Sequence, residues 1–326
     1  MHSAIRTLFA RARQWMTTNS VTPPKRKIVF IRLDKIGDLI CTLPADQVLD
    51  EKTYDITWIV QKGLGQIVDL GARKRKYLEL DKAHPARSAQ KLKEFLKVLD
   101  PDVAISFQCP WWVNYELYKA DVAIRAGVKS QWHSFFFLNH AIRQKRSKAE
   151  KHELEYNLDL VYHTLNPQQT ELFHYFEIPK PLETEVLEKF KLTAGKYVVV
   201  HPGMMGSALN WPQSEYIKYI NDLLGKKKHV VITGTESDEM YLTDIRKEFL
   251  KNPEVTWLQS KLNIKELVQV LAHSEMVLAP STGVAHLAAS VGAKVTGIFS
   301  PVRVHHPTRW GLRGPNVEII MLDGPS

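Results

Sequence analysis

A carboxylate that directly follows an apolar run is the first residue of this chain that could do chemistry. Asp38 ends the short polar turn DKIGD at residues 34–38, which comes after the run KIVFIRL at 27–33. An Asp at this place could cap the next helix, or it could act as a general base that takes the proton of a hydroxyl group. Gly37 beside it allows another group to approach the backbone closely. One Asp after one strand leaves both roles open.

The stretch HPGMMGSALNWP at 201–212 follows a second apolar run, YVVVH at 197–201. Its glycines and serine can present backbone N–H groups to a phosphate, and a helix that begins near Pro212 would add the positive end of its dipole. The spacings of a P-loop and of a dinucleotide-binding fingerprint are both absent. We therefore expect a different mode of phosphate binding, in which the phosphorylated ligand contacts Gly203, Ser207, Asn210 and Trp211.

Two further turns follow strand-like runs in the second half of the chain. In PSTGVAH at 280–286, Ser281 or Thr282 would cap a helix, and the free N–H groups around Gly283 favour an anionic diphosphate. His286 lies one turn inside that helix, where it could be structural or could stabilise a departing nucleotide as a protonated or hydrogen-bonding imidazole. The turn GTES at 234–237 suits a nucleoside, with Gly234 and Glu236 as candidate contacts.

These turns must be held by alternating strands and helices. Such alternation is typical of right-handed crossover units in a parallel sheet, and ligands of these sheets bind outside the carboxyl ends of the strands. The expected strands are 27–33, 53–60, 102–107, 197–201, 229–233, 276–279 and 294–299, and the expected helices are 39–50, 91–99, 152–165, 213–224, 264–272 and 284–291.

The alternation stops after about residue 107 and restarts at 197, so we expect two domains. The proline-containing stretch IPKP at 178–181 is typical of a linker. The sequence predicts an α/β protein with two Rossmann-like, doubly wound domains, at 25–180 and 181–326, that face each other across a cleft.

The composition of the chain limits its partners and its setting. The 326 residues include 44 Lys and Arg against 35 Asp and Glu, which gives a formal net charge of +9. This surplus suits nucleic acid, an anionic membrane or a phosphorylated substrate, but no nucleic-acid-binding motif is present and we expect no nucleic-acid partner. Cys41 and Cys109 do not imply a disulfide framework, so a reduced, cytosolic setting is the default.

The basic residues are concentrated in several segments. Residues 1–24 form a basic amphipathic extension that could touch anionic lipid or could be loosely packed, and they lack the features of a secretory signal. Basic runs at 73–76, 143–151 and 226–228 are more typical of solvated surface than of sites.

Together these turns resemble glycosyltransferase family 9, the bacterial lipopolysaccharide heptosyltransferase family. The resemblance covers roughly residues 26–320, and its most specific parts are KIGDLICTLPA, HPG…NWP and STGVAHLAASVGA, with a further likeness in HELEYNLD at 152–159. It implies a GT-B architecture, with the acceptor mainly on the N-terminal domain and the nucleotide sugar mainly on the C-terminal one. It also implies that Asp38 is the catalytic base, and that 281–283 and His286 bind the donor.

The implied reaction is an inverting single displacement that needs neither a metal ion nor a cofactor. The donor would be a nucleotide sugar, ADP-heptose, and the acceptor a lipopolysaccharide core or a related phosphorylated glycolipid. We expect Lys35, Gly37, Arg125 and part of 143–151 to contact that acceptor, with the protein peripheral to the inner face of the cytoplasmic membrane. Ser281 and Leu209 stand where the family tends to have Asp and Lys, so Ser207, Asn210 and a basic side chain such as Arg303 or Arg309 would supply phosphate contacts. These departures weaken the assignment of heptose more than that of glycosyl transfer.

Metal-dependent transfer and two other classes of function are the alternatives. Metal-dependent glycosyltransferases use an Asp-x-Asp pair, and residues 100–102 spell one, but they precede a strand and so lie at the wrong edge of the sheet. The adjacent pair His305 and His306 diverges and lacks a third ligand. A GT-B epimerase or hydrolase, or a non-catalytic sugar-nucleotide-binding protein, would retain the same turns.

Overall fold

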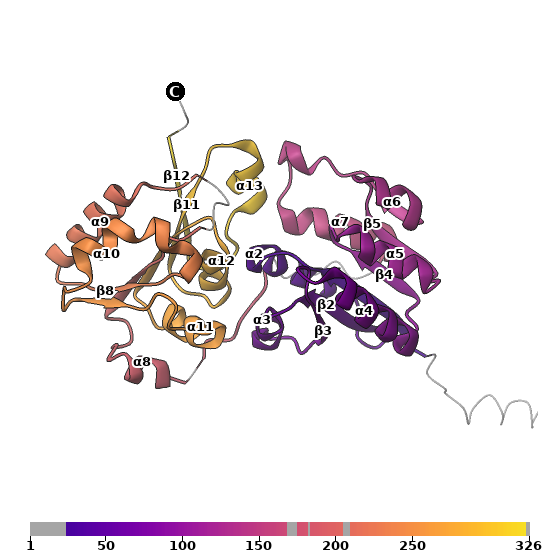
Figure 1. Cartoon of the computed structure of the whole chain (residues 1–326), viewed down its shortest axis with the longest axis horizontal. Coiled ribbons are helices and arrows are strands. Elements are labelled where there is room, and N and C mark those ends of the chain that lie inside the picture. Colours follow the sequence, from indigo (N-terminus) through magenta and orange to yellow (C-terminus); the bar gives the residue numbers. More distant parts are fainter. Residues whose placement is uncertain (1–23, 168–174, 182, 205–208, 324–326) are drawn as a thin grey trace, which may run out of the picture.

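The computed structural model describes residues 24–167, 175–181, 183–204 and 209–323. The predicted extension at 1–24 and Ser207 therefore lie outside the described residues, apart from position 24. Two α/β halves lie side by side in the molecule, with indigo to magenta elements in one and orange to yellow elements in the other (Figure 1).

The N-terminal half is built on a parallel sheet of six strands. Its core contains Phe30 and Phe107, whose rings meet edge to face at 5.5 Å, and Trp58, which meets Phe30 edge to face at 5.1 Å. In spatial order the strands are β3 (Lys76–Leu80), β2 (Tyr54–Gln61), β1 (Arg26–Arg32), β4 (Val103–Ser106), β5 (Ile124–Val128) and β6 (His140–Ile142). The helices are α2 (Ile36–Ile40), α3 (Gly65–Leu70), α4 (Pro85–Leu99), α5 (Trp111–Lys119), α6 (Trp132–Phe137) and α7 (Glu153–Leu165), with short 3-10 turns at Leu43–Asp46 and Arg146–Lys148.

The C-terminal half has a second parallel sheet of six strands. In spatial order these are β12 (Val317–Met321), β11 (Val295–Phe299), β10 (Met276–Pro280), β7 (Tyr197–Val200), β8 (His229–Ile232) and β9 (Val255–Trp257). The helices are α8 (Glu185–Lys189), α9 (Gln213–Gly225), α10 (Thr243–Phe249), α11 (Ile264–Ala272), α12 (Gly283–Ser290) and α13 (Pro307–Trp310), with 3-10 turns at Glu236–Tyr241 and Arg303–His305.

The predicted helix at 39–50 is wrong in both its start and its length. The helix α2 begins at Ile36 and ends at Ile40, and a separate 3-10 turn follows at Leu43–Asp46. Pro44 has no N–H group and cannot bond to the carbonyl of Ile40, so the α-helix cannot continue through it. Asp38 consequently lies inside the helix rather than at its cap.

The two halves meet where α2 packs against α12 (Figure 1). Two glycines allow this approach, since a Cβ atom on Gly283 would lie 2.6 Å from Cβ of Ile36, and one on Gly37 would lie 3.0 Å from Cδ2 of His286. One apolar cluster includes buried residues of both helices, such as Leu39 and Ala285. A side chain at position 283 would therefore force the two helices apart, and one at position 37 would make a tight contact with His286. The domain boundary at 180 stays a prediction.

None of the helices in the described ranges is both long and apolar enough to cross a membrane.

Candidate active site

A cavity of about 410 Å³ lies between the two halves, at the carboxyl ends of both sheets. The turn after β1 and the start of α2 line one wall, and the start of α12 together with the segment after β11 lines the other. The lining residues are Lys35, Gly37, Asp38, Ser281, Thr282, Gly283, His286, Val304, His305, Arg309 and Trp310. The structure thus brings together seven of the residues that the sequence singled out, from two turns more than 240 positions apart.

Asp38 is the carboxylate that the cavity offers for proton transfer. It is the third residue of α2, and its side chain, 24% exposed, makes no capping hydrogen bond. Arg32 Nη2 donates to its Oδ1 at 2.5 Å. Its Oδ2 has no hydrogen-bond partner among the residues that the structure describes, so this oxygen is available to an incoming hydroxyl. The main chain is fixed as well, because Thr42 Oγ1 donates to the Asp38 carbonyl at 2.6 Å.

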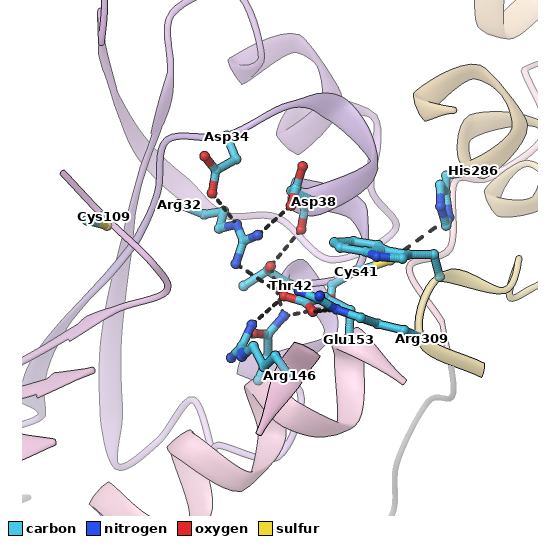
Figure 2. Close-up of polar contacts among 12 residues, drawn as sticks. Arg32, Asp34, Asp38, Cys41, Thr42, Cys109, Arg146, Glu153, His286 and Arg309 are labelled. Atoms are coloured by element: carbon cyan, nitrogen blue, oxygen red, sulfur yellow. Dashed lines mark hydrogen bonds and ion pairs between the residues drawn. The ribbon is translucent and has the colours of Figure 1, made fainter. Parts of the chain in front are cut away.

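Arg32, at the end of β1, is a buried cation that the sequence analysis did not single out. Its guanidinium lies 3.0 Å from Asp34, 2.5 Å from Asp38 and 3.6 Å from Glu153 (Figure 2). Burial disfavours the charged form, but the three carboxylates outweigh it and raise the pKa of Arg32. A charged residue at the end of an otherwise apolar strand was the signal that could have identified it.

Glu153 is the second functional residue that the sequence analysis missed. It is the first residue of α7, is fully buried, and is bonded to Arg146 Nη1 and, at 3.0 Å, to Arg309 Nε (Figure 2). Burial alone would raise the pKa of Glu153, yet the guanidinium groups of Arg146, Arg32 and Arg309 hold it below its usual value. Arg309 belongs to the C-terminal half and also lines the cavity, so the ion pair joins the two halves at the site.

The electrostatic network around Arg32 contains charges of both signs. It consists of three arginines (Arg32, Arg146, Arg309) and three carboxylates (Asp34, Asp38, Glu153), and Lys82 pairs with Asp34 at its more exposed edge at 3.2 Å. Burial lowers the pKa of Arg146 to about 10 in spite of its pairing with Glu153, so Arg146 stays charged at neutral pH. Arg32 therefore holds one oxygen of the Asp38 carboxylate, and Asp38 itself lines the cavity.

The start of α12 forms the opposite wall. Thr282 holds the N-cap position but makes no side-chain capping bond, and its Oγ1 is buried with no partner among the described residues. The first backbone N–H groups of a helix lack intrahelical partners and carry partial positive charge. An anionic group in the cavity could accept from these N–H groups and from Thr282.

His286 corrects one expectation. The ring is buried, its Nδ1 lies 3.9 Å from Cys41 Sγ, and its Cδ2 faces Gly37. Burial lowers the pKa of His286 to about 3, with a smaller contribution from His152. The imidazole is therefore neutral at pH 7, which does not fit a protonated His286 beside phosphate. The other two roles that the sequence allows, a structural histidine and a hydrogen-bonding imidazole, fit this arrangement.

The model of the family described as glycosyltransferase family 9 (heptosyltransferase) matches residues 90–325. This chain belongs to that family. A Haemophilus influenzae protein described as a "Putative glycosyltransferase" is 26% identical over 307 residues, which is 87% of this chain and 85% of that one. Lipooligosaccharide heptosyltransferase 2 of the same organism is 29% identical over 140 residues, 39% of each chain.

Solved structures show the same fold. ADP-heptose lipopolysaccharide heptosyltransferase II of E. coli has a TM-score of 0.74 and 14% identity, and covers 90% of both chains. A family 9 glycosyltransferase of Veillonella parvula has a TM-score of 0.75 and 16% identity over 94% of this chain and 88% of its own. An E. coli heptosyltransferase solved with ADP has a TM-score of 0.69 and 18% identity over 91% and 94%. These likenesses confirm the GT-B architecture of two Rossmann-like domains.

Several donor candidates of this glycosyltransferase do not line the interdomain cavity. Gly203 packs against Asp238, since a Cβ atom there would lie 2.2 Å from Cγ of that residue. The Asn210 amide donates to the Pro202 carbonyl at 2.8 Å and accepts from Tyr216 Oη at 2.8 Å, so it fixes its own loop. Trp211 packs against the C-terminal core. Leu209 is exposed.

The turn around Gly234 and Glu236 belongs to a second cavity. This space, of about 440 Å³, is lined by Glu236, Glu239, Arg246, Leu250, Trp257, Gln259 and Ser260. Gly234 does not line this space, but its carbonyl accepts a hydrogen bond from the backbone N–H of the lining residue Ser260 at 2.9 Å. The guanidinium of Arg246 lies 5.3 Å from the centre of the Trp257 ring. An indole and several polar groups at the carboxyl ends of β8 and β9 could hold a nucleoside.

Arg125 does not take part in the site of this family member. It is the second residue of β5, in register with Ala104 near the start of β4, whereas Asp38 follows the carboxyl end of β1. Its guanidinium donates to the carbonyls of Phe137 and Val122 at 2.8 and 2.6 Å. Arg125 therefore does not line the interdomain cavity, and its contact with a phosphorylated glycolipid acceptor stays a prediction.

The basic runs are not uniformly solvated surface. Arg146 is buried in the network of Glu153, and the Arg75 side chain, 3% exposed, makes two bonds to the Asp46 carboxylate at 2.7 and 3.0 Å. Of the two arginines expected to contact phosphate, Arg309 lines the interdomain cavity and Arg303 does not.

The sites considered for a metal ion have other contacts. Asp102 Oδ2 accepts from Lys27 N at 2.8 Å beside the amino end of β1, so Asp102 lies at the opposite edge of the sheet from Asp38. His305 lines the cavity, while His306 accepts from Thr308 N and caps α13. No group of three or more His, Cys, Asp and Glu side chains in the described part of the chain could hold a metal ion.

Proposed function

We propose that this family 9 glycosyltransferase transfers a sugar from a nucleotide-sugar donor to a hydroxyl group of a glycolipid, with inversion at the anomeric carbon. The observation that carries the proposal is the cavity shared by Asp38 of one domain and the start of α12 of the other. A base and a phosphate-binding wall from different domains suit a donor and an acceptor that arrive separately.

The donor phosphates would lie against the start of α12. Backbone N–H groups of its first turn and Thr282 Oγ1 would donate to the phosphate oxygens, and Arg309 and His305 line the same cavity. Preorganised donors of this kind stabilise the charge that develops on a leaving diphosphate. Ser281 offers a neutral hydroxyl where a carboxylate is usual in the family, so it removes a negative charge from beside the phosphates.

Asp38 would act as the general base. The acceptor oxygen attacks the anomeric carbon while its proton passes to Asp38 Oδ2. The bond from the anomeric carbon to the β-phosphate oxygen breaks, and the nucleoside diphosphate leaves with the electron pair. Arg32, which binds Oδ1 at 2.5 Å, keeps the carboxylate oriented and leaves Oδ2 to the acceptor.

The finer parts of the proposal concern the substrates and the setting. Relatives described as heptosyltransferases, one of them solved with ADP, support ADP-heptose as donor and a lipopolysaccharide core or related phosphorylated glycolipid as acceptor. Lys35 is exposed at the cavity mouth and would meet an acceptor phosphate. The reaction would use no cofactor and no metal ion, with the protein at the inner face of the membrane.

The substitution Asp38→Asn tests the assignment of the base. The amide is nearly isosteric but cannot accept the proton, so we expect the transfer rate to fall by about 100-fold or more, with unchanged stabilisation of the protein by ADP in a thermal-shift assay. Asp34→Asn is the matched control on the same turn, because it also pairs with Arg32. Normal transfer by the Asp38 variant would refute the base assignment, and donor turnover that needs no acceptor would indicate a hydrolase or an epimerase.

A further inference from the structure

The outer surface of α5 and α6 carries a concentration of aromatic side chains. All the aromatic residues among the large exposed hydrophobic side chains of the described part of the chain belong to these two helices, with Phe136 72% and Trp132 60% exposed. We call Trp111, Tyr118, Trp132, Phe135 and Phe136 the aromatic patch. Single exposed apolar residues are ordinary, but a contiguous group marks an interaction surface.

Ring contacts join Trp111, Tyr118, Trp132 and Phe136 through Phe137, and Phe135 precedes Phe136 on the same helix. The Trp132 ring lies 6.5 Å from that of Trp111 and 6.4 Å from that of Phe136, measured between centroids. Phe137 connects the two helices beneath, at 6.2 Å from Trp132 and 5.7 Å from Tyr118. The exposed rings therefore form one surface that spans two helices.

Cations border the aromatic patch. Lys129 Nζ lies 4.9 Å and the Arg143 guanidinium 6.0 Å from the centre of the Phe135 ring. Glu116 is the only acidic residue of α5 and α6, and residues 122–149 contain no Asp or Glu. That segment carries six basic residues, and three of them lie beside rings of the patch: Lys129, Arg143 and Arg125, whose guanidinium is 5.5 Å from the centre of the Tyr118 ring. The surroundings of the patch thus complement a negatively charged surface.

We propose that the aromatic patch docks the protein on an anionic lipid bilayer. Tryptophan, tyrosine and phenylalanine favour the boundary between headgroups and acyl chains, and neighbouring Lys and Arg attract anionic headgroups. This surface is distinct in sequence from residues 1–24. The inference gives the membrane contact of the proposed function a location, and vesicle binding tests it without any transfer reaction.

A third cavity lies between the aromatic patch and the active site and has lining residues from both regions. It has a volume of about 310 Å³ and is lined by Ser130, Gln131 and His133, around the start of α6, and by Asp34. Asp34 Oδ2 lies 3.0 Å from Nε of Arg32, which holds Asp38. A headgroup that leaves a bilayer at the patch would meet this polar cavity on its way to Asp38.

Vesicle co-sedimentation of the full chain tests the proposal. The vesicles contain phosphatidylcholine with or without phosphatidylglycerol, and the test variant is Phe135→Ser with Phe136→Ser. We expect the wild type to sediment with the anionic vesicles and the double variant to lose about tenfold or more in partition coefficient, since membrane affinity follows the apolar area that is buried. Val98→Ser with Met240→Ser removes two exposed apolar side chains elsewhere, 86% and 70% exposed, and should bind as the wild type does.

Two further measurements keep the test decisive. Lys129→Gln with Arg143→Gln leaves the rings in place and should weaken binding to anionic vesicles, with a smaller effect at high salt. Sedimentation velocity on the same variants distinguishes a second copy of this chain as the occupant. A wild type that binds neither kind of vesicle, a phenylalanine variant that binds as tightly as the wild type, or a dimer that the phenylalanine substitutions abolish would each overturn the proposal.

Discussion

At the scale of single residues, the site depends on buried arginines that are paired with a buried carboxylate, Glu153. Asp38 could be selected from the sequence because it follows a strand in a turn with a glycine. Glu153 could not, because its partners Arg32 and Arg309 lie 121 and 156 positions away and only the fold brings them together. The family resemblance of HELEYNLD drew attention to the segment, but it did not indicate that Glu153 is a buried partner of three arginines.

Glu153→Gln should destabilise the protein strongly. The amide keeps the shape but leaves Arg146, Arg32 and Arg309 without their shared carboxylate, and breaking a buried ion pair costs about 3–5 kcal/mol. Urea unfolding measures the loss. Glu155→Gln is the matched control two residues along α7, since Glu155 pairs with Arg313 at 3.1 Å where both side chains are exposed, and an exposed pair contributes about 1 kcal/mol or less. Equal effects of the two substitutions would contradict the network.

The contribution of Glu153 should also depend on pH. Its pKa is lower in the folded protein than the ordinary value of 4.5, so its stabilising effect is complete above that value and is lost as the pH falls through the lower folded pKa. The difference in unfolding free energy between wild type and Glu153→Gln should therefore be constant around neutral pH and shrink under acid conditions. A difference that grows as the pH falls would have the wrong sign.

At the scale of secondary-structure elements, the contact between α2 and α12 positions the site. The strands and helices with a strong apolar pattern were predicted well, and the bounds of α11 agree with the expected 264–272. The strand β3 was missed because its sequence, KYLEL, begins in a basic run. The early end of α2 follows from Pro44, which was visible in the sequence. The packing of α2 on α12 could not be predicted from the sequence, because it joins residues of different domains.

Gly283→Ala tests this contact. The added Cβ would lie 2.6 Å from Cβ of Ile36, so α2 and α12 must move apart, and we expect a destabilisation of about 1–3 kcal/mol together with reduced transfer. Gly225→Ala at the end of α9 is the control, because a Cβ there meets nothing within 4 Å. Thermal unfolding and a transfer assay on both variants measure the difference. Wild-type behaviour of Gly283→Ala would show that the close approach is not required.

At the scale of the whole molecule, two domains supply the residues that line one cavity. The net charge of +9 is compatible with the proposed phosphorylated donor and with an acceptor in an anionic membrane. The composition gives the net charge but not where the charges lie, because their positions depend on the fold. The side chains of Arg146 and Arg75 are buried in ion pairs, whereas other cations border the aromatic patch.

Nucleotide binding should stabilise the whole molecule. A ligand at 100 times its dissociation constant adds about 2.7 kcal/mol to the unfolding free energy. We expect ADP to raise the melting temperature more than UDP or GDP at the same concentration. Replacing Thr282 by Val keeps the side-chain shape but removes the Oγ1 donor, and should reduce the effect of ADP. An equal response to all three nucleotides would remove the support for ADP-heptose.

A crystal structure with an unreactive analogue of the nucleotide sugar tests the central claim most directly. The account predicts the diphosphate at the start of α12, within hydrogen-bonding distance of Thr282, and the anomeric carbon facing Asp38 with space between them for one hydroxyl group. A sugar that lies in the cavity beside Trp257, or whose anomeric carbon faces away from Asp38, would contradict it.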